Sequence, residues 1–148
     1  MDDAFKWAST NNGLCSEIDY PYTSGTTGKP GSCNQKACNK VKKSAPASFK
    51  DVQVNSDAAM MTALAQQPVS VAIQADMKEF QLYQSGVFTI ECGSKLDHGV
   101  LAVGYGTLNG IDYYKIKNSW YVISHYYINS LLLPLSLYLY INVIPALY

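Results

Sequence analysis

Arginine is absent from this chain of 148 residues, and its 11 lysines are balanced by 11 aspartates and glutamates, so that the formal net charge is zero. Proteins that bind nucleic acid usually carry a dense patch of basic side chains. The densest group of lysines, Lys40, Lys42 and Lys43, lies in a polar stretch that we interpret as a solvated loop. The charge pattern therefore gives no reason to expect nucleic acid as a partner.

Charged residues are also missing from the last part of the chain, residues 118–148. This segment is apolar over a length that is adequate to span a bilayer. Pro134 and Pro145 interrupt it, however, and no basic residue flanks it to anchor an end at the membrane surface. A membrane partner is therefore not expected, although a membrane-tethered fragment stays as an alternative.

No Cys-x-x-Cys pair occurs among the four cysteines, which are Cys15, Cys33, Cys38 and Cys92. This wide spacing argues against a zinc site, and we expect no metal ion. If some of the cysteines are oxidised to disulfides, the protein belongs in a secreted, vacuolar or lysosomal setting.

Two neighbouring segments carry the strongest structural signal. Residues 96–106, Leu-Asp-His-Gly-Val-Leu-Ala-Val-Gly-Tyr-Gly, predict a strand that is entered at His98 and broken by the glycines at its end. Residues 113–118 alternate between two faces with the period that marks a half-buried strand. The Asn109-Gly110 pair between them favours a tight hairpin turn. Two antiparallel strands are therefore predicted, with His98 near the start of one and Asn118 near the end of the other.

These positions allow an imidazole and a carboxamide to face each other. An amide oxygen can accept the proton of one ring nitrogen, fix the tautomer of the histidine and leave the other nitrogen free to act as a base. We therefore predict His98 as a general base and Asn118 as the residue that orients it. Asp97 is expected to be an exposed or hydrogen-bonding neighbour rather than a catalytic acid.

Four segments resemble the papain-like cysteine peptidases of the cathepsin L-like branch in their order and spacing. They are residues 67–72 (Gln-Pro-Val-Ser-Val-Ala), 80–88 (Phe-Gln-Leu-Tyr-Gln-Ser-Gly-Val-Phe), 96–106 and 117–120 (Lys-Asn-Ser-Trp). The resemblance extends from Met1 to Trp120 and implies the family's Cys-His-Asn triad, with His98 and Asn118 as two of its members. Trp120 would then shield their hydrogen bond from water and form part of the surface on the leaving-group side. The resemblance implies neither a metal ion nor an organic cofactor.

The resemblance also implies an α+β fold of which this chain holds a part. Residues 1–45 would be a remnant of the helical left domain with a cysteine-containing loop, and residues 46–120 most of the antiparallel, barrel-like right domain. Beyond Trp120 the resemblance ends, and residues 121–148 form an aberrant apolar tail. We interpret this tail as a translated intron, because the codons of Trp-Tyr-Val can contain a common intron start; a membrane anchor is the alternative. His125 lies in the tail and is expected to have no role.

Three residues match family positions that lie near the substrate. Ala72 and Leu96 resemble wall residues of a specificity pocket, and their side chains would leave that pocket roomy and apolar, which suits bulky hydrophobic substrate groups. Met1 matches a residue near the same pocket. It also fits a start codon that falls on an internal methionine, and both interpretations stay open.

In the family, cysteines that match Cys33 and Cys92 pair with partners upstream and downstream of this sequence. Cys15 and Cys38 either bridge each other, closing a loop around Pro30-Gly31, or remain thiols. Cys92 precedes His98 closely enough to suggest a Cys-His pair. Its disulfide role in the family, and the lack of a predicted helix N-terminus beside it, argue against a nucleophile at Cys92.

The family's nucleophile comes from a Cys-Gly-Ser-Cys-Trp motif, and one oxyanion donor comes from a glutamine just before it; neither motif occurs in these residues. We therefore expect a cysteine-type endopeptidase lineage in which the isolated chain is inactive. Peptides or proteins are the expected substrates, and cystatin-like proteins or a propeptide are the expected inhibitors. The parent enzyme would be lysosomal, vacuolar or secreted. The alternatives are a non-catalytic paralogue that binds peptides or inhibitors, and the membrane-tethered fragment.

Overall fold

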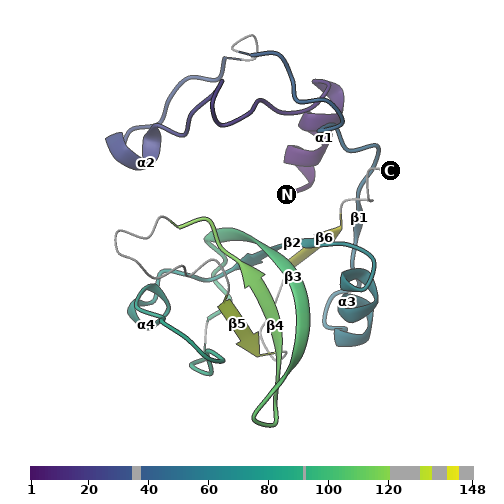
Figure 1. The fold of residues 1–148 in the computed structure, drawn as a ribbon, viewed down its shortest axis with the longest axis vertical. Helices are drawn as coiled ribbons and strands as arrows, with labels where there is room; N and C mark the ends of the chain where they lie inside the picture. The colour runs from purple at the N-terminus through teal and green to yellow at the C-terminus, as the bar shows by residue number, and fades with distance from the viewer. Residues whose placement is uncertain (35–37, 92, 121–130, 135–139, 144–148) are drawn as a thin grey trace. The chain divides into compact units, whose positions relative to one another are not determined.

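The computed structural model of the chain describes residues 1–34, 38–91, 93–120, 131–134 and 140–143 (Figure 1). The chain divides into two compact units, one formed by residues 1–48 and the other within residues 49–146. The boundary predicted from the sequence lies after residue 45.

The first unit begins with helix α1, Asp2–Thr10, whose first turn carries Asp2 and Asp3, where acidic side chains are favoured by the helix dipole. The helix ends before Gly13, which has a φ of +103° that side chains rarely adopt. Among the described residues that follow in this unit, one short helix, α2 (Ser24–Thr27), is formed, and the others are irregular. Little regular hydrogen bonding therefore holds this part of the unit together.

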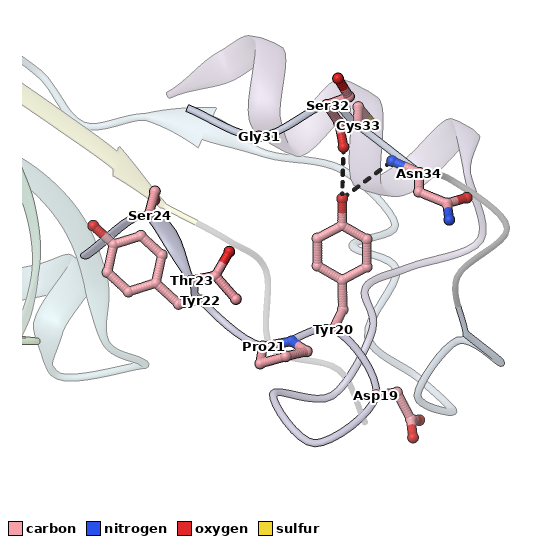
Figure 2. Close-up of a pocket in the computed structure, with 10 residues that line it drawn as sticks. All are labelled: Asp19, Tyr20, Pro21, Tyr22, Thr23, Ser24, Gly31, Ser32, Cys33 and Asn34. Carbon is pink, nitrogen blue, oxygen red and sulfur yellow. Dashed lines mark hydrogen bonds between the residues drawn. The ribbon is translucent and has the colours of Figure 1, made fainter. Parts of the chain in front are cut away.

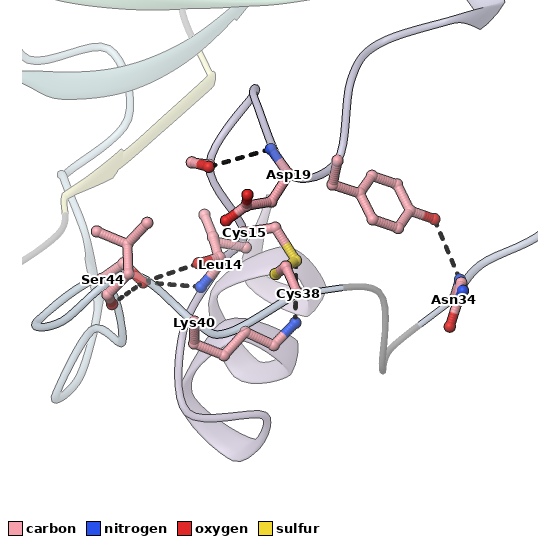
Figure 3. The surroundings of a disulfide bond; sticks show 10 residues. Leu14, Cys15, Asp19, Asn34, Cys38, Lys40 and Ser44 are labelled. Carbon is pink, nitrogen blue, oxygen red and sulfur yellow. Dashed lines mark hydrogen bonds between the residues drawn. A yellow bond between two sulfur atoms is a disulfide. The ribbon is translucent and has the colours of Figure 1, made fainter.

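A disulfide between Cys15 and Cys38 ties the two ends of that irregular segment (Figure 3). The two Cα atoms lie 5.8 Å apart and the two cysteines are separated by 23 positions in the sequence. Beside the bridge, the backbone N–H of Val41 donates to the carbonyl oxygen of Leu14 at 2.9 Å. The structure thus decides between the two alternatives that the sequence leaves open, in favour of the bridge.

The second unit is built on a six-stranded antiparallel sheet with the strand order β1-β6-β2-β3-β4-β5. The strands are β1 Lys50–Asp51, β2 Val69–Ile73, β3 His98–Leu108, β4 Ile111–Lys117, β5 Leu131–Pro134 and β6 Tyr140–Val143. Helices α3 (Asp57–Leu64) and α4 (Lys78–Gln81) belong to the same unit and pack against the sheet through Met60 and Phe80 (Figure 1). Helices and an antiparallel sheet in one chain confirm the predicted α+β class.

Strands β3 and β4 form the predicted hairpin. Asn109 and Gly110 have φ values of +52° and +78°, the left-handed geometry that a tight two-residue hairpin turn requires. The prediction that the strand breaks at its glycines is wrong, because β3 continues through them to Leu108. Instead, the register shifts between Ala102 and Gly104, which marks a β-bulge that absorbs one residue within the strand.

The core lies on one face of the sheet. Its fully buried or nearly buried strand residues, at alternate positions, are Val69, Val71, Ile73, Val100, Ala102, Tyr114 and Ile116. Met60 of α3, Phe80 of α4 and Phe88 pack with them. Burial of one such large apolar side chain stabilises a fold by about 1.5–3 kcal/mol, so this cluster fixes the register of β2, β3 and β4.

Strands β5 and β6 come from the segment that the sequence analysis assigns to an apolar tail. β5 pairs with β4 from Tyr113 to Ile116, and β6 pairs with β2 and β1. Sheet edges carry backbone groups that need partners, and these two strands supply them. The remainder of the tail, which includes His125, lies outside the described residues. Among the helices that the structure describes, none has the length and apolarity needed to cross a membrane.

Candidate active site

His98 is the first residue of β3 and pairs in register with Ile73 of β2. Its side chain occupies the same alternating face as the buried Val100 and Ala102. Asn118 follows β4 directly and shares the face of the buried Tyr114 and Ile116. Both side chains are half-buried and lie at one end of the sheet, where the core face meets solvent.

The imidazole Nε2 of His98 lies 2.8 Å from Oδ1 of Asn118. The same amide oxygen accepts a 2.8 Å hydrogen bond from the backbone N–H of Ser119, which determines which amide atom is the oxygen. Because an amide oxygen only accepts, Nε2 must carry the proton in this arrangement. The neutral ring therefore leaves Nδ1 as an unprotonated base. The predicted proximity of the two side chains is present, while their catalytic roles stay a prediction.

Trp120 stacks on the imidazole. The ring centroids of Trp120 and His98 are 5.1 Å apart with an angle of 26° between the planes. Phe80 contacts the indole edge to face, with centroids 5.4 Å apart at 85°, and the same Phe80 packs against the buried Phe88. The stack covers one face of the imidazole, and Phe80 connects it to the core.

The contact between Phe80 and Trp120 is a part of the site that the sequence analysis does not find. Phe80 is a residue of the short helix α4, and Trp120 lies beyond the end of β4. Nothing in either local pattern indicates that the two rings meet, since the contact depends on how α4 packs against the sheet. The aromatic character of both residues is the only sequence signal.

Asp97 takes part in a different set of hydrogen bonds from the His98–Asn118 pair. Its carboxylate Oδ1 accepts a 2.8 Å hydrogen bond from the backbone N–H of Ala75, and its own backbone N–H donates to the carbonyl of Ile73 at 3.1 Å. These bonds fasten the residue before His98 to the end of β2. Asp97 is therefore the hydrogen-bonding neighbour that the sequence predicts.

The remaining predicted substrate residues are distributed over the two units. Ala72 lies in β2 on the face opposite to the core and pairs in register with Gly99, where an added Cβ would meet open space. Leu96 is half-buried, two residues before β3. Met1 is the N-cap residue of α1 in the first unit and is 41% exposed. The pocket that these residues were expected to form stays a prediction.

None of the cysteines that the structure describes lies in the second unit with His98. Cys15 and Cys38 are bonded to each other, and Cys33 is an exposed free thiol of the first unit. Cys92, the residue that invited comparison with a Cys-His pair, lies outside the described residues. Within the described part of the chain, no group of three or more His, Cys, Asp or Glu side chains is placed to hold a metal ion.

An imidazole bonded to a carboxamide, stacked on an indole and carried on an antiparallel sheet is the arrangement that the sequence predicts for the base-bearing side of a thiol peptidase site. Comparison with protein families gives the same class. The model of the papain family cysteine proteases matches residues 1–124. The chain therefore belongs to the papain family of cysteine proteases.

Individual relatives agree with this assignment. The chain is 50% identical over 120 residues to a probable cysteine protease, RD21B, of Arabidopsis thaliana, and 49% identical over 120 residues to the oryzain beta chain of Oryza sativa subsp. japonica. Each match covers 81% of this chain and 25% of the relative. The chain thus spans about a quarter of the length of these two relatives.

Solved structures show the same fold. The bromelain protease from Ananas comosus, in complex with the E64 inhibitor, superposes with a TM-score of 0.77 at 28% identity, over 99% of this chain and 69% of bromelain. The ragweed pollen allergen Amb a 11, a cysteine protease in its proform, superposes with a TM-score of 0.82 at 26% identity, over all of this chain and 47% of the allergen. The fold is papain-like and partial.

Proposed function

We propose that this chain supplies the general base and its orienting group to peptide-bond hydrolysis by a thiol mechanism, with His98 as the base and Asn118 as the orienting residue. The observation that carries the proposal is the hydrogen bond of 2.8 Å between Nε2 of His98 and Oδ1 of Asn118. It leaves Nδ1 as the one ring nitrogen able to accept a proton.

The arrangement suits each step that a base must perform. Nδ1 takes the proton of a cysteine thiol, and the resulting thiolate and imidazolium stabilise each other. The thiolate attacks the peptide carbonyl carbon, and the imidazolium then returns the proton from Nδ1 to the leaving amine. The Asn118 oxygen stabilises the positive ring throughout, and the Trp120 stack limits water on one face of it.

The nucleophilic thiol is proposed to come from residues outside this sequence. Cys15 and Cys38 are bonded to each other, and the sequence contains no Cys-Gly-Ser-Cys-Trp motif. The chain also spans only about a quarter of the two plant relatives compared above. The isolated 148-residue chain is therefore proposed to be inactive.

The proposed substrates are peptides in which the second side chain on the acyl side of the cleaved bond is bulky and apolar. The side chains of Ala72 and Leu96 would form small or apolar walls of the substrate pocket. Gly99, which is opposite Ala72 in the sheet, has no side chain that could narrow it. A propeptide or an inhibitor would occupy the same surface, as the proform of Amb a 11 and the E64 complex of bromelain suggest for the family. The disulfide supports a secreted, vacuolar or lysosomal location.

A fluorogenic peptide assay tests the proposal on two proteins, the 148-residue chain and a longer protein in which a segment with the Cys-Gly-Ser-Cys-Trp motif precedes these residues. We expect turnover by the longer protein only, and a loss of about 10⁴-fold in that protein with His98→Ala. Lys78→Ala, on exposed α4 surface, is the matched control and leaves turnover unchanged. Turnover that survives His98→Ala in the longer protein would overturn the proposal.

A non-catalytic binding chain is the competing function, and a further measurement separates it. A binding chain holds a cystatin-like protein tightly but shows no turnover in the longer protein either. The proposed enzyme predicts that the same inhibitor abolishes turnover. Inhibitor binding is measured by calorimetry on the protein used for the assay.

A further inference from the structure

Two asparagines of this sequence, Asn12 and Asn109, are followed directly by glycine. Such a pair can react internally, because the backbone nitrogen of the glycine can attack the side-chain amide carbon of the asparagine, and glycine has no side chain to hinder the approach. Both asparagines have a positive φ, +57° for Asn12 and +52° for Asn109, so this angle does not distinguish them. The surroundings of the two glycine nitrogens, however, differ.

The nitrogen of Gly13 is held by the end of helix α1. Its N–H donates a 2.7 Å hydrogen bond to the carbonyl oxygen of Ala8, and Gly13 is buried. The side chain of Ser44 fills the space beside it, because a Cβ added at Gly13 would overlap the Ser44 hydroxyl oxygen. An attack by this nitrogen would therefore break the bond that ends the helix and displace a buried residue.

The nitrogen of Gly110 lies at the tip of the hairpin that joins β3 to β4 (Figure 1). Asn109, Gly110 and the residues on either side of them are exposed, and a Cβ added at Gly110 would meet open space. Within the described part of the chain, neither the N–H of Gly110 nor the side chain of Asn109 has a hydrogen-bonding partner. This nitrogen can therefore turn towards the side chain of Asn109 without losing a hydrogen bond.

Other asparagines precede residues whose side chains hinder the same attack. Asn34 precedes a glutamine, and its own N–H donates to the hydroxyl oxygen of Tyr20 at 3.1 Å, which holds its backbone in place (Figure 2). Asn118 precedes a serine whose N–H donates to Oδ1 of Asn118 at 2.8 Å. Asn55 is exposed and has a φ of +54°, but a serine follows it. These three positions therefore lack the unhindered nitrogen of the hairpin tip.

We propose that Asn109 is a modification site at which the chain deamidates without an enzyme. The backbone nitrogen of Gly110 loses its proton to solvent and forms a bond to Cγ of Asn109. The bond between Cγ and the side-chain nitrogen breaks, and that nitrogen takes up a proton and leaves as ammonia, so that a cyclic succinimide remains. Water then opens the ring at either of its carbonyl carbons and gives aspartate or isoaspartate. The reaction consumes water and releases ammonia, and it needs no oxidant or reductant.

The modification changes the charge and the turn at the tip. One carboxylate is added, so 12 acidic side chains replace 11 against the 11 lysines, and the formal net charge falls from zero to −1. In isoaspartate the backbone runs through the side-chain methylene group, which removes the two-residue turn. His98 lies at the other end of β3, which five residue pairs align with β2, so it keeps its place. The inference does not depend on the proposed peptidase function.

Peptide mass spectrometry in water enriched in the heavy oxygen isotope tests the proposal. The folded chain is incubated in this water at mildly alkaline pH, so that a carboxylate formed during the incubation carries the heavy oxygen. We expect label at Asn109 to accumulate about tenfold faster than at Asn12, because attack by Gly13 requires the loss of a backbone hydrogen bond. Asn55 should stay unlabelled. Equal rates at Asn12 and Asn109, or a faster rate at Asn12, would overturn the proposal.

The same incubation in concentrated urea separates structure from local sequence. In the unfolded chain both Asn-Gly pairs should react at similar rates, since the hydrogen bond of Gly13 is lost. If the unfolded chain is labelled at Asn109 while the folded chain is not, the tip does not react in the native protein and the proposal is wrong.

A pair of glycine variants locates the attacking nitrogen. Gly110→Ala should lower the labelling of Asn109 to the level of Asn55, because the added methyl group hinders the approach of the nitrogen. Gly31→Ala, at an exposed glycine of the first unit where a Cβ also meets open space, is the matched control and leaves labelling at Asn109 unchanged. Labelling of Asn109 that persists at the original rate in Gly110→Ala would contradict the proposed attack.

Discussion

The hydroxyl group of Tyr114 donates a hydrogen bond of 2.8 Å to Oδ1 of Asp57. Tyr114 is a β4 residue with 1% of its surface exposed, and Asp57 is the first residue of α3. The bond therefore attaches the start of the helix to the middle of the sheet. Burial raises the pKa of Tyr114 well above its ordinary value of 10.0, and the hydrogen bond to Asp57 and the charge of that carboxylate raise it further.

Tyr114→Phe should therefore lower stability in a pH-dependent way. In the folded protein Tyr114 keeps its proton above pH 10, while the unfolded chain releases it, so this group's contribution is complete below pH 10 and is lost as the pH rises above that value. We expect the variant to lose about 1 kcal/mol at neutral pH and to show a shallower decline in alkali. Urea unfolding at pH 7 and above pH 10 measures both quantities.

Tyr105→Phe is the control for this prediction. Tyr105 is opposite Tyr114 in the register of β3 and β4, but its side chain is 44% exposed. The control should match the wild-type protein at both pH values. Equal losses in the two variants would show that the bond to Asp57 contributes nothing measurable.

Asn118→Ala should release the imidazole of His98 from a single tautomer. Without the amide oxygen, Nε2 has no fixed acceptor, and the two neutral tautomers become mixed. Nitrogen chemical shifts of the ring, measured by NMR with a His125→Ala variant for assignment, report the ratio. Ser119→Ala is the matched control, because it keeps the backbone N–H that bonds the same oxygen. An unchanged tautomer in Asn118→Ala would contradict the proposed orienting role.

Trp120→Ala should expose the imidazole to reagents. The substitution removes the stacked indole and the edge-to-face contact with Phe80, and such aromatic pairs contribute about 0.5–1.5 kcal/mol each. We expect acylation of His98 by diethyl pyrocarbonate to become several-fold faster, as followed by peptide mass spectrometry. Trp7→Ala changes the other tryptophan, in the first unit, and should leave that rate as it is.

Ser56→Ala should destabilise the second unit through α3. The Ser56 hydroxyl oxygen accepts a 3.2 Å hydrogen bond from the backbone N–H of Ala59 and thereby caps the first turn. Loss of such a cap costs about 1 kcal/mol. Urea unfolding checks the value, and Ser56→Thr, which keeps an accepting hydroxyl group, should lose much less.

The hairpin and the pair at its open end could be predicted because the signals are local. Asn109-Gly110 fixes the turn, and alternation with Tyr114 and Ile116 fixes the face on which Asn118 lies. The bulge beyond Ala102 could not be predicted, since it depends on how two strands share one core. The glycines in β3 predicted a break in the strand, but a glycine can also be required where another side chain lies very close to the backbone. At Gly106, an added Cβ would lie 2.9 Å from the hydroxyl oxygen of Tyr113.

The other features that the sequence does not predict are contacts between segments that are distant in the sequence. The contact of Phe80 with Trp120 gives no periodic pattern in the sequence, and neither does the pairing of β5 with β4 or of β6 with β2. Each of these contacts depends on a partner that lies far away in the sequence. The Cys15–Cys38 bridge is a similar case, since spacing alone does not determine which cysteines pair.

The bulge in β3 separates two halves of the hairpin, and different neighbouring segments align each half. On the His98 side, β3 is aligned by five residue pairs with β2, so this end is held even if the turn changes. On the Asn109 side, the ribbon is aligned by β4 and the turn. Insertions at the tip can therefore lengthen the ribbon without moving the histidine, which leaves that tip open to variation among related chains while the end with His98 and Asn118 stays in place.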